Sequence, residues 1–216
     1  MSMLDEKDNN RIINVKSNYL YIKRVIDFLG SLIGLIVLIP LFLVIVLLIK
    51  ADDPKGPVFY KQIRVGKNGK EFYMYKFRSM YVDAESRLDE LLSKNDVGGA
   101  MFKMKNDPRV TKIGKFIRKT SLDEFPQLLN VLKGDMSLVG PRPPLPHEVE
   151  QYTAYDKQRL TVIPGCTGLW QISGRNNVGF DKMVELDLQY IESISLMNDV
   201  KIIVKTVGVI FEGDAY

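Results

Sequence analysis

The sequence predicts an α+β fold: an N-terminal re-entrant membrane helix hairpin followed by a small globular domain of helices around a short antiparallel β-hairpin. Three observations predict it. Residues 28–49 form a run of 22 residues without a charge, Pro40 interrupts this run, and Asn68 with Gly69 separates two strand-like stretches. The resulting parts are a flexible or interfacial leader over residues 1–20, the re-entrant membrane helix over 21–52 and the globular domain over 53–216.

The apolar run is long enough to cross a bilayer. A straight helix over residues 25–49 would be about 37 Å long, against a hydrocarbon core about 30 Å thick. However, Pro40 removes a backbone hydrogen bond and kinks the helix, leaving arms of roughly 22 and 14 Å. A cleaved signal peptide fits poorly, because the run starts well inside the chain and no small-residue cleavage pattern follows it.

Basic residues flank the apolar run on both sides, and such residues set the orientation of a membrane segment. Four precede the run and six follow it: Arg11, Lys16, Lys23, Arg24, Lys50, Lys55, Lys61, Arg64, Lys67 and Lys70. A helix that bends at Pro40 and returns keeps both flanks on one side. A single-span anchor stays open as an alternative, because kinked helices also span membranes.

The globular part reads as a β-hairpin followed by short helices. Asn68 and Gly69 supply the turn of a hairpin over residues 58–80. Helical patterns are expected over 82–93 and over 110–119, the second with Asp107 as its N-cap. A capping box of Ser121 with Glu124 predicts the start of a third helix, which ends at Lys133-Gly134-Asp135. Further helices are expected near 148–160, 180–194 and 199–211, with irregular chain at 164–177.

Composition excludes several classes of protein. Against 26 acidic residues the chain has 30 Lys plus Arg, and this net charge of +4 gives no indication of nucleic-acid binding. With 46% hydrophobic residues it is too apolar to be disordered as a whole. The single cysteine, Cys166, excludes a disulfide-linked secreted scaffold and favours a reducing compartment.

Asp123 and Glu124 are adjacent at an expected helix start, where free N–H groups and the helix dipole favour negative charge. Both are expected to stay ionised at neutral pH. Plain helix capping remains an alternative for this pair. The segments 55–78 and 101–119, each of net charge +6, flank the carboxylates in the sequence. Such cations attract phosphates or anionic lipid headgroups, although a solvated basic face would explain many of them.

Three arginines are better phosphate candidates than the lysines of the hairpin. Arg118, Arg142 and Arg175 each stand beside helix-start or glycine and proline signals, where a guanidinium can be fixed for bidentate contact. Carboxylates beside fixed cations suit phosphoryl chemistry either as Mg²⁺ ligands or as a nucleophile that forms an acyl phosphate. The residues alone leave both roles open.

Five blocks of the sequence, in this order, closely resemble one family. They are KFRSM at 76–80, TSLDEFPQLLNVLKGDMSLVGPRP at 120–143, PGCTGLWQISGRN at 164–176, LDLQYIESIS at 186–195 and the ending Asp214-Ala215-Tyr216. The family is the bacterial sugar transferases, monotopic polyprenyl-phosphate hexose-1-phosphate transferases that start cell-surface glycan assembly. The resemblance covers about residues 21–216, and with its short leader the chain resembles the minimal catalytic form. Asp214 departs from the glycine of many relatives.

The resemblance implies roles for individual residues. Asp123 is expected to be the nucleophile, and with Glu124 it is expected to bind Mg²⁺. Arg118 and Arg142, together with Lys76 and Arg78 of the first block, are expected to bind phosphate. Arg175 and Asn176 are candidates for the nucleotide or the sugar phosphate. The membrane hairpin is expected to bend at Pro40, with the catalytic domain, 53–216, on the cytoplasmic face of the inner membrane.

The expected reaction moves a sugar 1-phosphate from a UDP-sugar to polyprenyl (undecaprenyl) phosphate and releases UMP, through a phosphosugar on Asp123. Two alternatives stay open: direct transfer with the carboxylates only as metal ligands, and an inactive membrane scaffold for glycan enzymes. Expected partners are the two substrates, the lipid bilayer, downstream glycosyltransferases and a possible second copy of the chain, with no nucleic acid. The sequence does not indicate which sugar is transferred.

Overall fold

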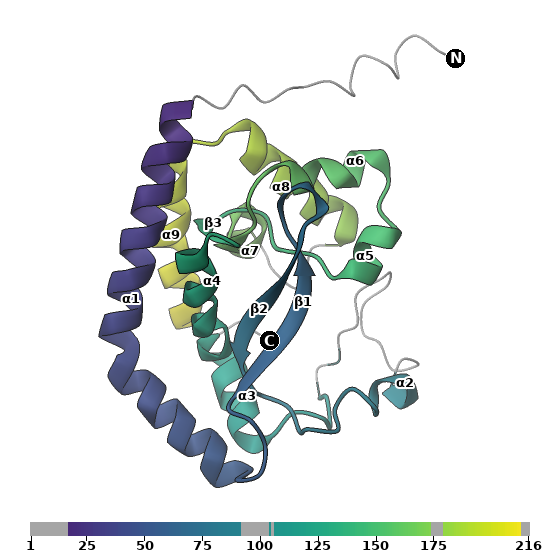
Figure 1. Ribbon diagram of the computed structural model, residues 1–216. Helices are drawn as coiled ribbons and strands as arrows, with labels where there is room; N and C mark the ends of the chain where they lie inside the picture. The colour runs from purple at the N-terminus through teal and green to yellow at the C-terminus, as the bar shows by residue number, and fades with distance from the viewer. Residues whose placement is uncertain (1–16, 92–103, 105, 174–178, 213–216) are drawn as a thin grey trace.

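The computed structural model describes residues 17–91, 104, 106–173 and 179–212 (Figure 1). One long helix lies along a globular body of short helices and two small sheets. The elements in chain order are α1 (Ser17–Asp52), β1 (Phe59–Val65), η1 (Lys67–Gly69), β2 (Glu71–Phe77), α2 (Leu88–Leu91), α3 (Lys112–Lys119), η3 (Leu122–Gln127), α4 (Leu128–Lys133), β3 (Ser137–Val139), α5 (Pro146–Glu150), α6 (Ala154–Lys157), η4 (Gln158–Thr161), β4 (Gly165–Thr167), α7 (Leu169–Ile172), α8 (Phe180–Glu192) and α9 (Leu196–Glu212). The α+β class is confirmed.

Helix α1 is one continuous helix with Pro40 inside it, not two antiparallel arms. Figure 1 shows it bending along its length, so that its second arm runs beneath the globular body. Within the described chain, residues Tyr19–Asp52 are the one helical stretch long and apolar enough to cross a membrane. Its outward side chains include Val37, 68% exposed, and Leu47, 70% exposed. Insertion of this helix into a membrane as a re-entrant segment stays a prediction.

The first arm of α1 is attached to the globular body by polar side chains. Arg24 donates to the carbonyl oxygens of Val131 and Leu132, at 2.6 and 2.8 Å, in the last turn of α4. The buried Asp27 accepts the backbone N–H of Leu138 in β3 at 3.1 Å. Arg24 thus binds two carbonyl oxygens at the end of α4, of which that of Val131 also accepts the Gly134 N–H at 3.1 Å, and Asp27 pairs a backbone N–H of β3.

The second arm of α1 is attached to the same body, mainly through apolar packing. Ile45 and Ile49 are buried in a cluster with Phe77 of β2 and Ile117 of α3. The side chain of Asp52 accepts the backbone N–H of Ile113 at 3.2 Å. Both arms of the apolar helix are therefore fixed to one globular unit.

The predicted β-hairpin is confirmed. Strands β1 and β2 pair antiparallel from Phe59 opposite Phe77 to Val65 opposite Glu71. Asn68 and Gly69 adopt the positive φ angles, 56° and 78°, that the connection needs. Because residues directly opposite in the register share a face, Tyr60 and Lys76 lie on the same side of the hairpin.

A second sheet was not predicted, and one of its strands, β4, lies in the segment 164–177 that was expected to be irregular. Strand β3 pairs parallel with β4, Ser137 opposite Gly165 and Val139 opposite Thr167. Gly165 approaches the neighbouring backbone so closely that a Cβ there would lie 2.0 Å from the Gly140 nitrogen. The pairing therefore depends on glycine at this position.

Several predicted helix boundaries are wrong. Residues 82–87 form turns, and of the helix expected over 82–93 the described residues contain only α2, while 92 and 93 lie outside them. The N-cap before α3 is Thr111, whose hydroxyl accepts the Gly114 N–H, whereas the side chain of Asp107 binds Arg109. The helix expected near 148–160 is divided into α5, α6 and η4. The last two helices are confirmed as α8 and α9, which begins at Leu196.

Candidate active site

The two adjacent carboxylates lie in η3, a short 3₁₀ helix between α3 and α4. Ser121, which precedes it, adopts a left-handed conformation with φ 55° and makes no capping bond with its side chain. The predicted capping box is therefore wrong, because an N-cap needs an extended backbone at that residue. The side chain of Glu124 contacts Lys76 instead, with Nζ and Oε1 2.6 Å apart.

Asn130 in α4 fixes this region against the hairpin. Its fully buried side chain accepts the N–H of Tyr75 at 3.0 Å and donates to the carbonyl oxygen of Tyr73 at 2.7 Å. The amide thus satisfies two backbone groups on one edge of β2, where the antiparallel partner β1 lies on the other edge. This bond pair holds η3 and its carboxylates beside Lys76.

Asp123 is buried, with 8% of its surface exposed. Burial raises its pKa to about 6, the negative charge of Glu124 acts in the same direction, and Lys76 and Arg118 oppose the change. At pH 7 the carboxyl group is consequently mostly ionised, as the sequence predicts. Its proton affinity is nevertheless well above that of an exposed aspartate.

Glu124 has the opposite electrostatic balance. Although burial by itself raises its pKa, the ammonium group of Lys76 outweighs this effect, and Arg142 and Arg64 add to it, so the pKa lies below its ordinary value. Two adjacent carboxyl groups thus have pKa values moved apart by their surroundings. This separation is common at sites of acid, base or nucleophilic chemistry.

Four cations from separate elements surround the carboxylates. Lys76 comes from β2, Arg118 from the last turn of α3 and Arg64 from β1, while Arg142 lies in the proline-rich loop between β3 and α5. Arg142 is half-buried and lies 3.8 Å from Glu148, measured from NH1 to Oε2. This concentration of positive charge suits an anionic ligand with several phosphate oxygens.

The donor set of this site fits a magnesium ion shared with a ligand. In the described chain no cluster of three or more Asp, Glu, His or Cys side chains could enclose a metal by itself. Mg²⁺ is commonly held by one or two carboxylates together with water and substrate phosphates. Asp123 and Glu124 supply such a pair.

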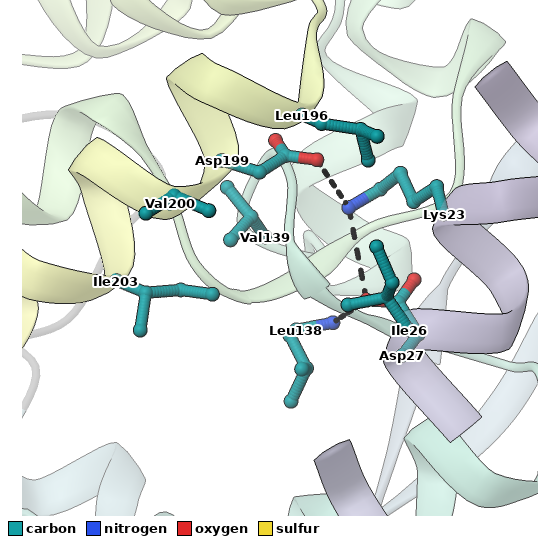
Figure 2. A pocket seen from close by; sticks show the side chains of 9 residues that line it. All are labelled: Lys23, Ile26, Asp27, Leu138, Val139, Leu196, Asp199, Val200 and Ile203. Atoms are coloured by element: carbon teal, nitrogen blue, oxygen red, sulfur yellow. Dashed lines mark hydrogen bonds and ion pairs between the residues drawn. The ribbon is translucent and has the colours of Figure 1, made fainter. Parts of the chain in front are cut away.

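The cavity between α1 and α9 is a different feature, shown in Figure 2. It measures about 40 Å³, room for about three water molecules at 10–15 Å³ each. Lys23 on its wall contacts Asp199 at 2.9 Å and Asp27 at 3.7 Å. This lysine is thus paired inside the protein, and the cavity is a small gap in the attachment of α1.

Comparison with known proteins decides the family. The model of the bacterial sugar transferase family matches residues 18–213. The chain belongs to this family. Residues 18–213 include α1 as well as every element of the site, so the long apolar helix and the carboxylate pair are parts of the same family unit.

Named relatives of this sugar transferase come from several bacteria. The chain is 53% identical over 199 residues to the galactosyl transferase CpsE of Streptococcus agalactiae serotype III, covering 92% of the chain and 44% of CpsE. It is 48% identical over 198 residues to the undecaprenyl-phosphate galactose phosphotransferase of Salmonella typhimurium, covering 90% and 41%. It therefore spans less than half of these two relatives. ExoY of Rhizobium meliloti, an exopolysaccharide production protein, is 44% identical over 189 residues, covering 86% and 83%.

The structure brings together five of the predicted site residues, namely Asp123, Glu124, Lys76, Arg118 and Arg142. It does not bring Arg78 to them. The guanidinium of Arg78 is buried and binds Asp53, at 2.5 Å, and the carbonyl oxygen of Pro57. Arg175 and Asn176 lie outside the described residues. Pro40 lies inside α1, as expected.

Arg64 is a site residue that the sequence did not single out. It was counted only among the basic residues of the hairpin segment. The register offers a signal, because Arg64 is four residues from Tyr60 along β1 and Tyr60 is opposite Lys76. Residues i and i+4 of a strand share a face, so Arg64 and Lys76 lie on the same side of the hairpin.

Proposed function

We propose that the chain is a membrane-bound phosphoglycosyl transferase that moves a sugar 1-phosphate from a UDP-sugar to polyprenyl phosphate and releases UMP. The observation that carries this proposal is the buried Asp123 beside Glu124, enclosed by Lys76, Arg118 and Arg142 in one unit with an apolar helix. Relatives named as an undecaprenyl-phosphate galactose phosphotransferase and a UDP-galactose-lipid carrier transferase support it.

In the first step a carboxylate oxygen of Asp123 attacks the phosphorus that carries the sugar. The bond from that phosphorus to the bridging oxygen breaks, and UMP leaves with the electron pair. A phosphosugar then remains on Asp123 as an acyl phosphate. Lys76, Arg118 and Arg142 stabilise the charge that develops on the phosphoryl oxygens.

In the second step an oxygen of polyprenyl phosphate attacks the same phosphorus. The bond to Asp123 breaks, which restores the carboxylate and gives a polyprenyl diphosphate sugar. Asp123 and Glu124 would hold Mg²⁺, which supplies charge neutralisation at the phosphate oxygens when bound. Because Glu124 stays ionised through its contact with Lys76, it keeps negative charge available beside the nucleophile.

The attachment of α1 supports the membrane position that we propose. A helix that spans the bilayer places its two ends on opposite sides, yet Arg24 and Asp27 in the first arm and Ile49 and Asp52 in the second contact one globular body. This favours a helix that enters and leaves through one face over a single-span anchor. The basic residues on both flanks favour the cytoplasmic face of the inner membrane.

Covalent trapping tests the mechanism. The unsubstituted protein, incubated with UDP-galactose radiolabelled in the sugar and no lipid acceptor, is expected to become labelled and to release UMP once. Asp123→Asn should abolish labelling and lower turnover by about three to six powers of ten. Glu71→Gln, which neutralises an exposed carboxylate at the hairpin turn, is the matched control and should label normally.

Two other outcomes identify the alternatives. Full turnover without a labelled protein would support direct transfer, with the carboxylates only as metal ligands. A scaffold would release no UMP with any sugar nucleotide, and Asp123→Asn would have no effect. A panel of UDP-sugars with UMP detection determines the sugar, and UDP-galactose is the first donor to test because three relatives are named for galactose.

A further inference from the structure

The loop that carries Arg142 is fixed in an unusual way. In its central stretch, residues 141–144, three of the four residues are prolines without an N–H to donate, so this stretch is held mainly through its carbonyl oxygens. All four carbonyls accept a hydrogen bond. The donors, in chain order of the acceptors, are the Gly165 N–H at 2.9 Å, the Arg159 guanidinium at 3.3 Å, the Arg64 guanidinium at 2.9 Å and the Val65 N–H at 2.9 Å.

Within the described chain, Arg64 is held by neutral oxygen atoms and contacts no carboxylate. It is 5% exposed, and its contacts in the described chain are with the Gln62 side chain, at 2.7 and 3.2 Å, and with the carbonyl oxygen of Pro143. Burial, with the like charge of Arg142 adding to it, lowers its pKa to about 9. Burying a cation without a contacting carboxylate costs folding free energy. The position of Arg64 is therefore better explained by a role in the candidate active site than by a contribution to the stability of the fold.

Arg159 reaches the loop from η4. It is 2% exposed and forms a buried ion pair with Asp187 of α8. NH1 donates to the Tyr152 hydroxyl at 2.7 Å, and NH2 donates to the carbonyl oxygen of Arg142 itself. Asp187 and Tyr152 orient this guanidinium. It therefore gives the loop a second fixed donor, at the residue whose positive charge helps to lower the pKa of Glu124.

We propose that Arg64 and Arg159 are positioning residues that bind the carbonyl oxygens of Pro143 and Arg142 and thereby fix the guanidinium of Arg142 for the phosphate of the substrate. This inference rests on the proposed transferase function. Neither arginine touches substrate in this proposal, and both act through Arg142. Displacing a charge-stabilising group by about 1 Å costs on the order of 100-fold in rate.

A double-mutant cycle on kcat/KM tests the proposal. Arg64→Gln is expected to lower kcat/KM for the UDP-sugar by about 30- to 100-fold when Arg142 is present, but less than about 3-fold in an Arg142→Gln background, since coupled residues are not additive. Arg159→Gln should behave in the same way. Arg64→Lys, which keeps the charge and one donor, should lose less kcat/KM than Arg64→Gln. This variant replaces Arg64→Gln in the cycle if Arg64→Gln folds poorly.

The matched control is Arg109→Gln, which removes another buried arginine, bound to Asp107 in the loop before α3. Arg109→Gln is expected to change kcat/KM by the same factor in both backgrounds, because the bonds of Arg109 within the described residues are to Asp107 and the carbonyl oxygen of Ala84, not to the proline-rich loop. Equal factors for Arg64→Gln in both backgrounds would overturn the positioning role. The proposed function would then stand, provided that the unsubstituted protein transfers sugar phosphate.

The same set of variants is also compared by a second measurement, the dissociation constant for inorganic pyrophosphate in the presence of Mg²⁺. Weaker binding after Arg64→Gln only when Arg142 is present supports the positioning role independently of turnover. A protein that neither transfers sugar phosphate nor binds pyrophosphate would refute both proposals. Pyrophosphate binding that responds to Arg142→Gln but not to Arg64→Gln would refute only the positioning role.

Discussion

Replacing Asp123 by asparagine should inactivate the protein and at the same time stabilise it. Burial raises the pKa of this carboxyl group from 3.8 to about 6, so the folded state binds the proton more tightly than the unfolded state. The free energy of unfolding therefore falls as the pH rises from about 4 to about 6 and is level above that. Asparagine has no proton to lose and avoids this cost.

The gain from Asp123→Asn follows from the two pKa values. It is about 1–2 kcal/mol at pH 5 and about 3 kcal/mol at pH 7.5, at 1.36 kcal/mol for each pKa unit. For a chain of this size, 3 kcal/mol corresponds to an increase of about 6–12 °C in melting temperature. Thermal unfolding of the detergent-solubilised protein, followed by circular dichroism at pH 5 and pH 7.5, measures both the gain and its pH dependence.

Asp107→Asn is the matched control for this measurement. Asp107 is also buried, but although burial alone raises its pKa, hydrogen bonds from Arg109 hold the pKa below its ordinary value. Its ion pair stabilises the fold at every pH above about 4 and is lost only in stronger acid, so Asp107→Asn should lower the melting temperature equally at pH 5 and 7.5. An Asp123→Asn protein that melts no higher than the unsubstituted protein at pH 7.5 would refute the reasoning.

Four further predictions concern the site and the membrane helix. The value of kcat/KM should decline in acid as Asp123 is protonated, with a midpoint at or below about pH 6 because bound Mg²⁺ favours the carboxylate; UMP release measured from pH 4 to 8 that stays constant would contradict this. Removal of divalent cations with EDTA should abolish UMP release and Mg²⁺ should restore it, whereas undiminished release would count against the carboxylates as metal ligands. Arg24→Gln should destabilise the fold by about 1.5–3 kcal/mol, seen as a lower melting temperature, because it removes charge-assisted bonds to two carbonyls of α4. Pro40→Ala should straighten α1 and favour spanning, which labelling of a cysteine at residue 10 from the periplasm would detect; periplasmic labelling without the substitution would overturn the re-entrant placement.

Local signals predicted the hairpin and the last two helices correctly. Asn68 and Gly69 determine a tight connection whatever surrounds them, and the apolar periodicity of 180–194 extends over several turns. The pairing of β3 with β4 has no comparable signal. These strands have three residues each and are separated by 25 residues of chain rich in proline and short helices, so only tertiary contacts bring them together.

The candidate site was predictable in part for similar reasons. The family resemblance identified the carboxylates and most of the cations around them, but it also suggested Arg78. Strand β2 ends at Phe77, so the alternation that would place Arg78 on the face of Lys76 no longer applies, and Asp53 binds it instead. Ser121 shows the same limit of local signals. Its residue type and its spacing from Glu124 fit an N-cap, whereas in the tight connection after α3 its backbone is left-handed.

Under the proposed membrane placement, the hydrogen bonds from Arg24 to the last turn of α4 help to set the distance between Asp123 and the lipid. Helix α4 has six residues, about 9 Å along its axis, and directly follows the 3₁₀ turn that carries Asp123. Inserting one residue into α4 would rotate that aspartate by about 100° and shift it by about 1.5 Å relative to the bilayer. If the proposed function and membrane placement hold, the protein should accept many different apolar residues on the outer side of α1, yet lose access to polyprenyl phosphate when the length of this one short helix changes.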